Sequence, residues 1–326
     1  MPGTFEMRRL RYFVKVAELR SLTRAAETLH VAQPALSHHM HALESELGVQ
    51  LLERGPRGVG LTEAGRQLLE ETRRMLADMQ QMVERVKAGS PVVEGEVVVG
   101  IGQTVGSLLA APLIETAMRR LPRVRIQVRE MMSGLLPDLV RSREIDFAIS
   151  YNIADGDGVE SVGLLTEDMC VVGQRRLLDG LVGSMRSSTI ELDRLGNVPL
   201  FLSRRSHAMR ELLERSARTR RVTLDIDAEI DSLYIMKDLV MRGVGCGIFS
   251  MANVYRELKH HDLRVLRIVR PAIRREVCLV RRQGQVTSRA ARELSRIAVD
   301  VLLDLVRDGV WQATPRGEPA DIRNRL

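Results

Sequence analysis

The chain begins with apolar positions at the spacing of three short helices. Ser21 or Thr23 can cap the second helix, and Pro34 fits the first turn of the third, where a missing N–H costs nothing. A Gly/Pro turn then joins two short apolar runs between residues 49 and 61, which indicates a hairpin. The pattern predicts a helix over residues 5–19, a short helix that carries Ala25, Ala26 and Leu29, and a third that carries Leu36, Met40, Leu43 and Leu47.

A long helix with a seven-residue repeat is predicted next, with Thr62 as its cap. The repeat consists of two interleaved series, Leu68, Met75 and Met82 and then Thr72, Met79 and Val86. A period of 3.5 residues favours pairing with a second copy of the same helix. The alternative is an amphipathic helix that packs within one subunit. Gly89-Ser90-Pro91 is expected to end this helix and form a hinge.

Beyond residue 91, short apolar runs alternate with amphipathic segments, which indicates mostly parallel sheets in two α/β lobes. Residues 314–326 are polar and are expected to form a frayed tail. The expected strands are 96–101, 124–128, 147–150, 169–172, 200–202, 222–228, 247–249 and 276–280. The expected helices are 108–121, 135–142, 208–217, 233–241 and 288–306.

Composition narrows the class of protein. The 326 residues are 44% hydrophobic and 28% charged, which excludes a disordered or collagen-like chain. No apolar run reaches the roughly 18 residues of a membrane helix, and the N-terminus lacks an apolar signal core. The three cysteines are scattered, as is typical of a reducing compartment. We therefore expect a cytoplasmic protein without a membrane partner.

Most of the net charge of +7 lies outside residues 1–65. Residues 1–65 carry eight basic and seven acidic side chains, whereas residues 203–282 carry 18 basic and 10 acidic ones. The overall charge therefore does not by itself identify a nucleic-acid-binding surface.

The polar face of the third helix nevertheless has the chemistry of a DNA reader. Gln33, Ser37, His38 and His41 can hydrogen-bond phosphates or base edges in a major groove. In the following hairpin, Arg57 suits a narrow minor groove and Arg54 suits a phosphate. On these residues alone, an ordinary small helical domain remains the alternative.

Residues 7–66 closely resemble the winged helix-turn-helix of LysR-type transcriptional regulators. The motifs that carry the resemblance include Ala25-Ala26, Gln33-Pro34-Ala35, Leu43-Glu44, Leu47-Gly48, Leu51-Leu52, Leu61-Thr62 and Ala64-Gly65. The resemblance implies an α/β protein with an N-terminal winged helix-turn-helix, a long linker helix and a two-lobed effector domain like that of periplasmic binding proteins. It also implies that Gln33, Pro34, Ser37 and His38 face the groove, with Arg54 and Arg57 in the wing.

The resemblance further implies a regulator of promoter DNA that is controlled by a small molecule bound between the lobes. Such proteins dimerise through the linker helix and form homotetramers, and activators contact RNA polymerase. The expected domains are residues 1–65 for DNA binding, 62–90 for the linker and hinge, 91–164 with 270–310 for lobe I, 165–269 for lobe II and 311–326 for the tail.

The third helix departs from the family at His38-His39, where Arg-Gln is usual, and at Ala32, where Ser is frequent. Losing the arginine removes a donor worth about 1–3 kcal/mol of base discrimination, so the operator preference at this position is open. Because histidine changes charge near neutral pH, we predict that operator affinity depends on pH through His38. A metal site formed by the clustered histidines would need further ligands.

Residues 100–106 follow an apolar strand and open a helix, as a dinucleotide-binding loop does, but Val105 occupies the position of the third glycine. We interpret this turn as a small-anion site in which backbone N–H groups are helped by Gln103 and Thr104. The resemblance adds Ser133, Ser203 and Arg204 on other loops of the cleft, and Arg204 can pair with a carboxylate. Simple helix capping by these Ser and Thr side chains is the alternative.

Other functions find little support. No nucleophile elbow, zinc-protease motif or Cys-x-x-Cys is present, so we expect neither an enzyme nor a cofactor or metal. Asp225, Asp227, Glu229 and Asp231 alternate along a strand and are expected to form a solvated face. The alternative function is a solute-binding or thiol-redox sensor module without operator-specific DNA binding; Cys170 and Cys246 lie 76 residues apart.

Overall fold

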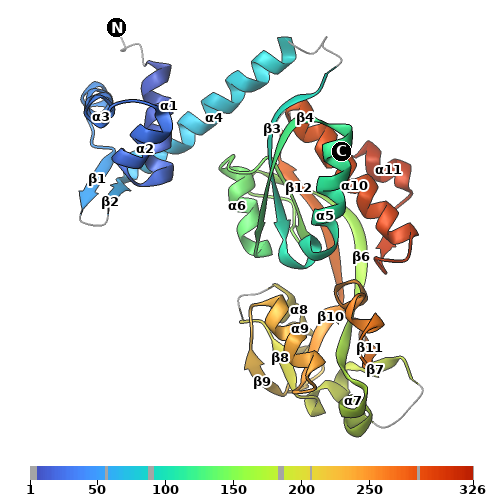
Figure 1. Ribbon diagram of the computed structural model, residues 1–326. Helices are drawn as coiled ribbons and strands as arrows, with labels where there is room; N and C mark the ends of the chain where they lie inside the picture. The colour runs from blue at the N-terminus through green and yellow to red at the C-terminus, as the bar shows by residue number, and fades with distance from the viewer. Residues whose placement is uncertain are drawn as a thin grey trace. The chain divides into compact units, whose positions relative to one another are not determined.

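The computed structural model describes residues 6–55, 58–86, 92–182, 187–205, 208–284 and 287–325 (Figure 1). The chain separates into two compact units, Met1–Gly89 and Ser90–Leu326. No helix among the described residues is long and apolar enough to cross a bilayer.

The N-terminal unit consists of helices and one hairpin, as the sequence predicts. Ser21 caps the second helix, because its side chain accepts a hydrogen bond from the Arg24 N–H. Gly48, at φ 70°, ends the third helix in the left-handed conformation that glycine adopts most easily. The elements are α1 (Met7–Leu19), α2 (Leu22–Leu29), α3 (Gln33–Leu47), β1 (Leu52–Gly55), β2 (Gly58–Leu61) and α4 (Glu63–Val86).

One apolar core holds these elements together, with Phe13, Leu36 and Leu43 fully buried in it. The Glu44 carboxylate accepts hydrogen bonds from the backbone N–H groups of Leu51 and Leu52, at 2.9 and 3.1 Å. This contact fixes the end of α3 to the start of the hairpin. A capping threonine follows the hairpin, as predicted: the Gly65 N–H donates to the hydroxyl of Thr62, 3.0 Å away.

The helix α4 divides into a part that packs within the subunit and a part that does not. Leu68 packs against the N-terminal core, and Thr72 is 2% exposed. Met75 and Met82 are 37% and 53% exposed. The first turns of α4 therefore pack within their own subunit, which was the alternative to helix pairing. The side chains of Met75 and Met82 are not covered in this way.

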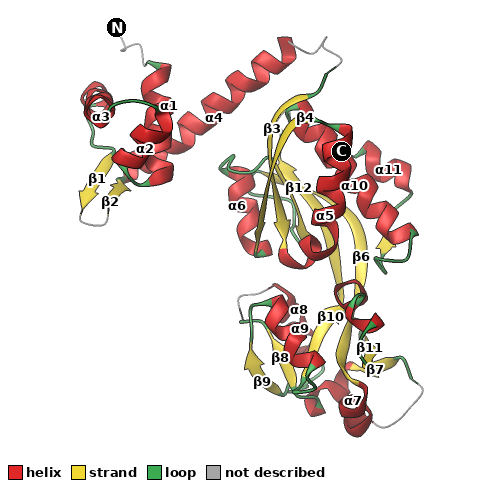
Figure 2. Cartoon of the chain, in the orientation of Figure 1, coloured by secondary structure: helices red, strands yellow, loops and turns green. Residues whose placement is uncertain are grey.

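The C-terminal unit is an α/β structure (Figure 2). Its strands are β3 (Glu94–Gly102), β4 (Arg123–Met131), β5 (Phe147–Tyr151), β6 (Val159–Gln174), β7 (Thr189–Glu191), β8 (Leu200–Leu202), β9 (Ile226–Glu229), β10 (Cys246–Ser250), β11 (Leu263–Val269), β12 (Arg274–Arg282) and β13 (Thr314–Pro315). Its α-helices are α5 (Gln103–Arg120), α6 (Leu136–Arg141), α7 (Arg175–Val182), α8 (Ala208–Thr219), α9 (Leu233–Met241), α10 (Arg289–Arg307) and α11 (Pro319–Asn324). Short 3₁₀ segments are Ser133–Leu135, Leu192–Asn197, η4 (Met251–Val254) and Glu257–Lys259.

The strands form two groups, one in each lobe. In lobe I, β3 pairs in parallel with β4 and β5, and in lobe II, β8 pairs in parallel with β9 and β10. The long strand β6 belongs to both groups and runs from one lobe into the other (Figure 1).

The expectation of mostly parallel sheets is wrong. The strand β6 is antiparallel to each of its partners β10, β11, β12 and β13, and β12 is also antiparallel to β5. The reason is that the chain crosses between the lobes in extended strands. The strand β6 runs from lobe I to lobe II, and the strands that return beside it run in the opposite direction and pair with it antiparallel. Local strand–helix alternation carries no information about these long-range pairs.

The expectation of a frayed tail is also wrong. Thr314 pairs with Thr166 of β6, and Ile322 of α11 is fully buried against lobe I. Arg323 forms an ion pair with Asp300 of α10 at 2.6 Å. A single apolar residue, Ile322, anchors this polar segment, which is too little for sequence periodicity to reveal.

Candidate functional site

The first candidate surface is the start of α3. Gln33, Pro34 and His38 are exposed, and Ser37 is half-buried. The apolar residues Leu36, Met40 and Leu43 hold the opposite face of the helix in the core. The structure thus brings these four predicted DNA-contacting residues together on one accessible end of a helix. In the wing, Arg57 lies outside the described residues; Arg54 lies on β1, and only its backbone is described.

The neighbouring histidines differ in environment. The ring of His39 packs edge-on against Tyr12, with 5.3 Å between centroids. Burial and the charges of Arg8 and Arg9 lower the pKa of His39. His39 therefore favours its neutral form more than a free histidine does, and its ring packs against α1 through Tyr12. Among the described residues, no group of three or more His, Cys, Asp or Glu side chains is placed to hold a metal ion.

The backbone at the wing is held closely against the helices. Gly58, at φ 112°, lies so near the end of α1 that a Cβ there would be 2.6 Å from the Arg20 carbonyl oxygen. The same carbonyl accepts a hydrogen bond from Val59 N–H at 3.0 Å. These contacts set the direction in which the hairpin leaves the helical core.

The second candidate site lies at the start of α5, in lobe I. The helix begins at Gln103, directly after β3, and its first N–H groups have no partner inside the helix. The N-cap residue is Gly102, which has no side chain to cap these groups. A Cβ placed on Gly102 would lie 3.0 Å from the Ser150 hydroxyl oxygen and 3.3 Å from that of Ser133. Two hydroxyl groups therefore lie against the backbone at the start of α5.

Ser150 was not among the residues expected from the sequence. Its side chain is fully buried, and within the part of the chain that the structure describes its hydroxyl has no hydrogen-bond partner. Most buried hydroxyls do have one. No local motif identifies Ser150, because its proximity to Gly102 arises from the pairing of β5 beside β3.

The predicted residue Thr104 belongs to a buried polar network and does not cap α5. Its hydroxyl accepts a hydrogen bond from Arg275 at 3.3 Å, and its carbonyl accepts one from the Asn253 amide at 3.1 Å. Thr104 lies in α5 of lobe I, and Asn253 lies in η4, which follows β10 of lobe II and packs against the lobe I core through Ala252. The turn that was expected to line the cleft is thus bonded to the segment that leaves β10.

The remaining predicted residues also lie near the boundary of the lobes. Arg204 of lobe II contacts the sulfur of Met132 in lobe I at 3.1 Å, next to Ser133. Its guanidinium also pairs with Asp231 at 3.3 Å, so the carboxylate expected for Arg204 is supplied by this chain. The Ser203 carbonyl accepts a hydrogen bond from the buried Arg210 at 3.1 Å. Gln103 is half-buried beside Thr104.

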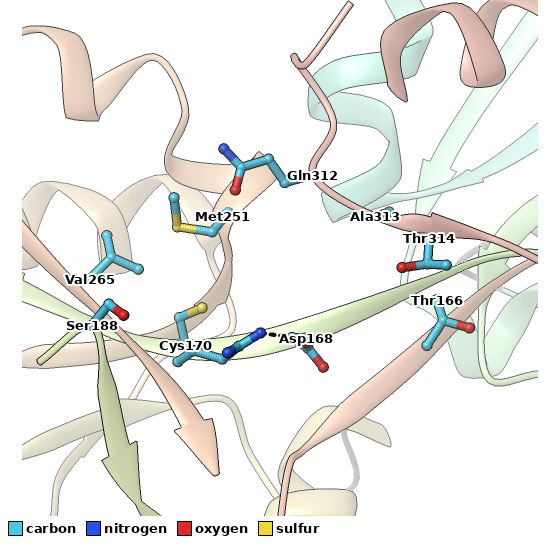
Figure 3. A pocket seen from close by; sticks show the side chains of 10 residues that line it. Thr166, Asp168, Cys170, Ser188, Met251, Val265, Gln312, Ala313 and Thr314 are labelled. Carbon is cyan, nitrogen blue, oxygen red and sulfur yellow. Dashed lines mark ion pairs between the residues drawn. The ribbon is translucent and has the colours of Figure 1, made fainter. Parts of the chain in front are cut away.

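The place where β6 passes from lobe I into lobe II is called the interlobe hinge, or simply the hinge, from here on. A cavity of about 470 Å³ lies beside it (Figure 3). Its lining includes Thr166, Asp168 and Cys170, which alternate along β6 with the buried Glu167. Alternate residues of a strand face opposite sides, so the cavity and Glu167 lie on opposite faces of β6. None of the five predicted effector residues lines this cavity.

The cysteines do not have the environment of reactive thiols. Cys170, Cys246 and Cys278 are free and buried. Burial raises the pKa of both Cys170 and Cys246 to about 12, and it raises the pKa of Cys278. A protonated, buried thiol is a poor nucleophile.

Comparison with known proteins identifies both units. Residues 7–66 match the bacterial regulatory helix-turn-helix protein of the lysR family, and residues 91–303 match the LysR substrate binding domain. The chain belongs to the LysR family. It is a DNA-binding transcriptional regulator with a substrate-binding domain.

Individual relatives of this LysR-family regulator include the nitrogen assimilation regulatory protein nac of Klebsiella aerogenes, which is 33% identical over 74% of this chain and 77% of the relative. The dual regulator OxyR of Escherichia coli is 27% identical over 85% and 90% of the two chains. Among solved structures, a full-length OxyR variant from Pseudomonas aeruginosa superimposes with a TM-score of 0.76 at 23% identity, over 97% and 100% of the chains. CbnR in complex with its target DNA gives 0.63 at 24% identity, over 92% and 99%.

Proposed function

We propose that this regulator binds double-stranded promoter DNA with the start of α3 in the major groove, and that a small anion bound at the start of α5 controls it. The observation that supports the DNA surface is the exposed set of Gln33, Pro34, Ser37 and His38 on a helix whose other face is buried. Such a helix can enter a groove without disturbing the core. Arg54 and Arg57 of the wing are proposed to contact the backbone and minor groove.

A mobility-shift assay tests the DNA surface, using the promoter region upstream of the protein's own gene. Gln33→Ala is expected to weaken specific binding by about 5- to 150-fold, the range of a base contact worth about 1–3 kcal/mol. The thermal stability should not change, because Gln33 is exposed. The matched control is Gln67→Ala on α4, which is equally exposed and away from α3. Binding that unrelated competitor DNA removes equally well would instead support a solute-binding module.

The anion site is supported by three features that meet at one point. These are the free N–H groups at the start of α5, the orphan hydroxyl of Ser150 and the nearby hydroxyl of Ser133. A helix N-terminus favours negative charge, and hydroxyls can donate to it. Gln103, Thr104, Ser203 and Arg204 are proposed to complete the site from both lobes. The effector would act by changing the angle between lobes, which extended strands such as β6 permit.

A thermal-shift screen of small carboxylates and of sulfur and nitrogen metabolites tests this site in the full chain. A ligand present at 100 times its Kd adds about 2.7 kcal/mol of stability. Ser150→Ala and Ser133→Ala should remove the shift. Ser188→Ala is the matched control, because Ser188 lines the cavity on the other side of β6. If the ligand-induced thermal shift is lost in Ser188→Ala but kept in Ser150→Ala, the effector binds in that cavity and not at the start of α5.

The proposed oligomer is a homodimer that pairs through α4 and assembles into a homotetramer. The exposed Met75 and Met82 support the pairing, since a partner helix would cover them. The proposed lobe boundaries are residues 91–164 with 270–310 for lobe I and 165–269 for lobe II. If the protein activates transcription, RNA polymerase is a further partner.

A further inference from the structure

Two oppositely charged side chains face each other at the centre of the hinge. Arg275 of β12 lies directly opposite Glu167 of β6 in the antiparallel register. The guanidinium Nε donates to the Glu167 carboxylate at 2.7 Å, and the two side chains are 5% and 0% exposed. Buried charges of this kind are tolerated only with good geometry and further hydrogen bonds.

The other donors of Arg275 reach into both lobes. In lobe I, one terminal nitrogen donates to the Tyr151 hydroxyl at 2.9 Å, and the other donates to the Thr104 hydroxyl at 3.3 Å. In lobe II, Arg275 donates to the side-chain oxygen of Asn253 at 2.9 Å and to Ser250 at 3.3 Å. All three guanidinium nitrogens take part, and Nη2, with two N–H groups, is shared among Tyr151, Asn253 and Ser250. Lysine has a single nitrogen and cannot reproduce this planar pattern.

The charge of Arg275 is maintained despite its burial. Burial by itself disfavours the charged form, but Tyr151 and Glu167 outweigh it, and the pKa of Arg275 is raised. The guanidinium also lies over the face of the Tyr151 ring, 3.6 Å from its centroid. A permanent cation thus lies directly behind the turn at the start of α5.

This cation determines how the Thr104 hydroxyl can act. A hydroxyl has one proton, and its oxygen already accepts a hydrogen bond from Arg275. The proton of Thr104 is therefore directed away from Arg275, and in the ligand-free protein the Thr104 hydroxyl is also hydrogen-bonded to the Tyr151 side chain. A carboxylate bound at the start of α5 would compete with Tyr151 for this proton. A ligand that takes this proton also polarises the bond to Arg275.

We propose that Arg275, held by Glu167, is the positioning residue of the cleft: it orients the Thr104 hydroxyl as a donor to the ligand and connects that hydroxyl to Ser250 and Asn253 of lobe II. This inference rests on the proposed anion site at the start of α5. Because one guanidinium bonds both lobes, a change at Thr104 reaches η4 without passing along the backbone.

The chain contains a natural reporter for this network. Trp311 is its single tryptophan and is fully buried. The indole N–H donates to the Glu167 oxygen. Intrinsic fluorescence therefore reports the environment of Glu167 without a label, in the full chain and in its complex with DNA.

The experiment is a double-mutant cycle in the ligand-free full chain, read by hydrogen exchange of the amides of Met251–Val254. Thr104→Val should raise their exchange rate by about 3- to 10-fold, within the range expected for the net loss of one typical hydrogen bond. In an Arg275→Lys background the same substitution should change the rate less than about twofold, since coupled residues are not additive. Thr104→Ser keeps the hydroxyl and should restore the wild-type rate.

The control is Arg274→Lys, which alters the adjacent, exposed pair with Asp168 and should leave these amides unchanged. If Arg275→Lys does not fold, Ser250→Ala replaces it, because it removes an acceptor of Arg275 on the side of η4 and leaves the guanidinium in place. Equal effects of Thr104→Val in both backgrounds would overturn the proposal and leave Arg275 with a merely structural role.

A second arm separates this proposal from the anion site itself. Sodium acetate is titrated against sodium chloride at constant ionic strength, with exchange followed at the start of α5 and at Met251–Val254. Protection of both segments in the wild type, but of the α5 segment alone in Arg275→Lys, supports the coupling. Protection of both segments in both proteins overturns it. If acetate protects neither segment in the wild type, the anion site fails, and the ligand-free cycle still decides the coupling.

Discussion

The DNA-binding face of α3 and the hinge between the lobes place their polar residues in opposite environments. On α3, Gln33, Pro34 and His38 are exposed and lie within six positions of one another. At the hinge, Glu167 and Arg275 are buried, lie 108 positions apart and bond to residues of both lobes. The first set contributes to recognition without supporting the fold. The second set must be complete for the fold to tolerate its charges, so function and stability are linked there.

The largest expected effect is on stability at the hinge. Glu167→Leu should lower the free energy of unfolding by about 3–5 kcal/mol, because Arg275 then remains buried and unpaired. Asp168→Leu, in the exposed pair on the other face of β6, should cost less than about 1 kcal/mol. Urea unfolding followed by Trp311 fluorescence measures both.

The double variant Glu167→Leu/Arg275→Met sharpens this comparison. Removing both charges should recover most of the lost stability, since an apolar pair of similar volume often replaces a buried ion pair at little cost. A double variant as unstable as Glu167→Leu would show that the charge of Arg275 is not the cause.

The second effect concerns the buried thiols. With the pKa of Cys170 and Cys246 raised to about 12, their thiolate fraction at pH 8 is about 10³-fold below that of a free cysteine. Alkylation by iodoacetamide should be suppressed accordingly in the folded chain and rapid in urea. Fast alkylation of either residue in the folded chain would favour the thiol-redox alternative.

The same shifts predict a pH dependence of stability. Each thiol has a higher pKa in the folded protein than in the unfolded protein, where it is near 8.5. At any pH below about 8.5 this difference stabilises the folded state by its full amount. This contribution is lost as the pH rises from about 8.5 to 12. Cys170→Ala and Cys246→Ala should each flatten the alkaline part of the unfolding curve, as measured by urea unfolding at a series of pH values.

The third effect concerns the exposed part of α4. This part is exposed like the DNA-binding face of α3, but we propose that a second copy of α4 covers it. Met75→Glu/Met82→Glu should weaken the dimer more than about tenfold, because each buried methionine contributes about 1.5–3 kcal/mol. Sedimentation velocity measures this change. Gln67→Glu adds the same charge at an exposed position outside the repeat and should leave the dimer intact.

The smallest expected effect is on DNA binding at the exposed end of α3. At fixed salt and pH, His38→Ala should weaken operator binding a few-fold, because one hydrogen bond to a phosphate or base edge is lost. His260→Ala, in an exposed turn of the C-terminal unit, should leave the affinity unchanged. Fluorescence anisotropy with labelled operator DNA measures both, and an unchanged affinity of His38→Ala would contradict the proposed contact.

The sequence alone determined the N-terminal unit and the general class of the C-terminal one. The helices, caps and hairpin of the N-terminal unit follow from repeats and capping residues that lie within a few positions of the elements they define, such as Ser21, Thr62 and Gly48. The same is true of α9 and β8, whose predicted bounds coincide with the structure. Local interactions decide such elements, so a linear pattern records them.

Only the tertiary structure decided the hinge and the composition of the candidate cleft. The crossing of β6 and β12 brings Thr104, Asn253 and Arg275 together, and the pairing of β5 beside β3 brings Ser150 to Gly102. Three further strands also depend on distant partners. The strand β6 pairs with β11 and β13, and β11 in turn pairs with β7. Their partners lie far away in the sequence, and a strand or a buried charge is stable only when that distant partner is in place.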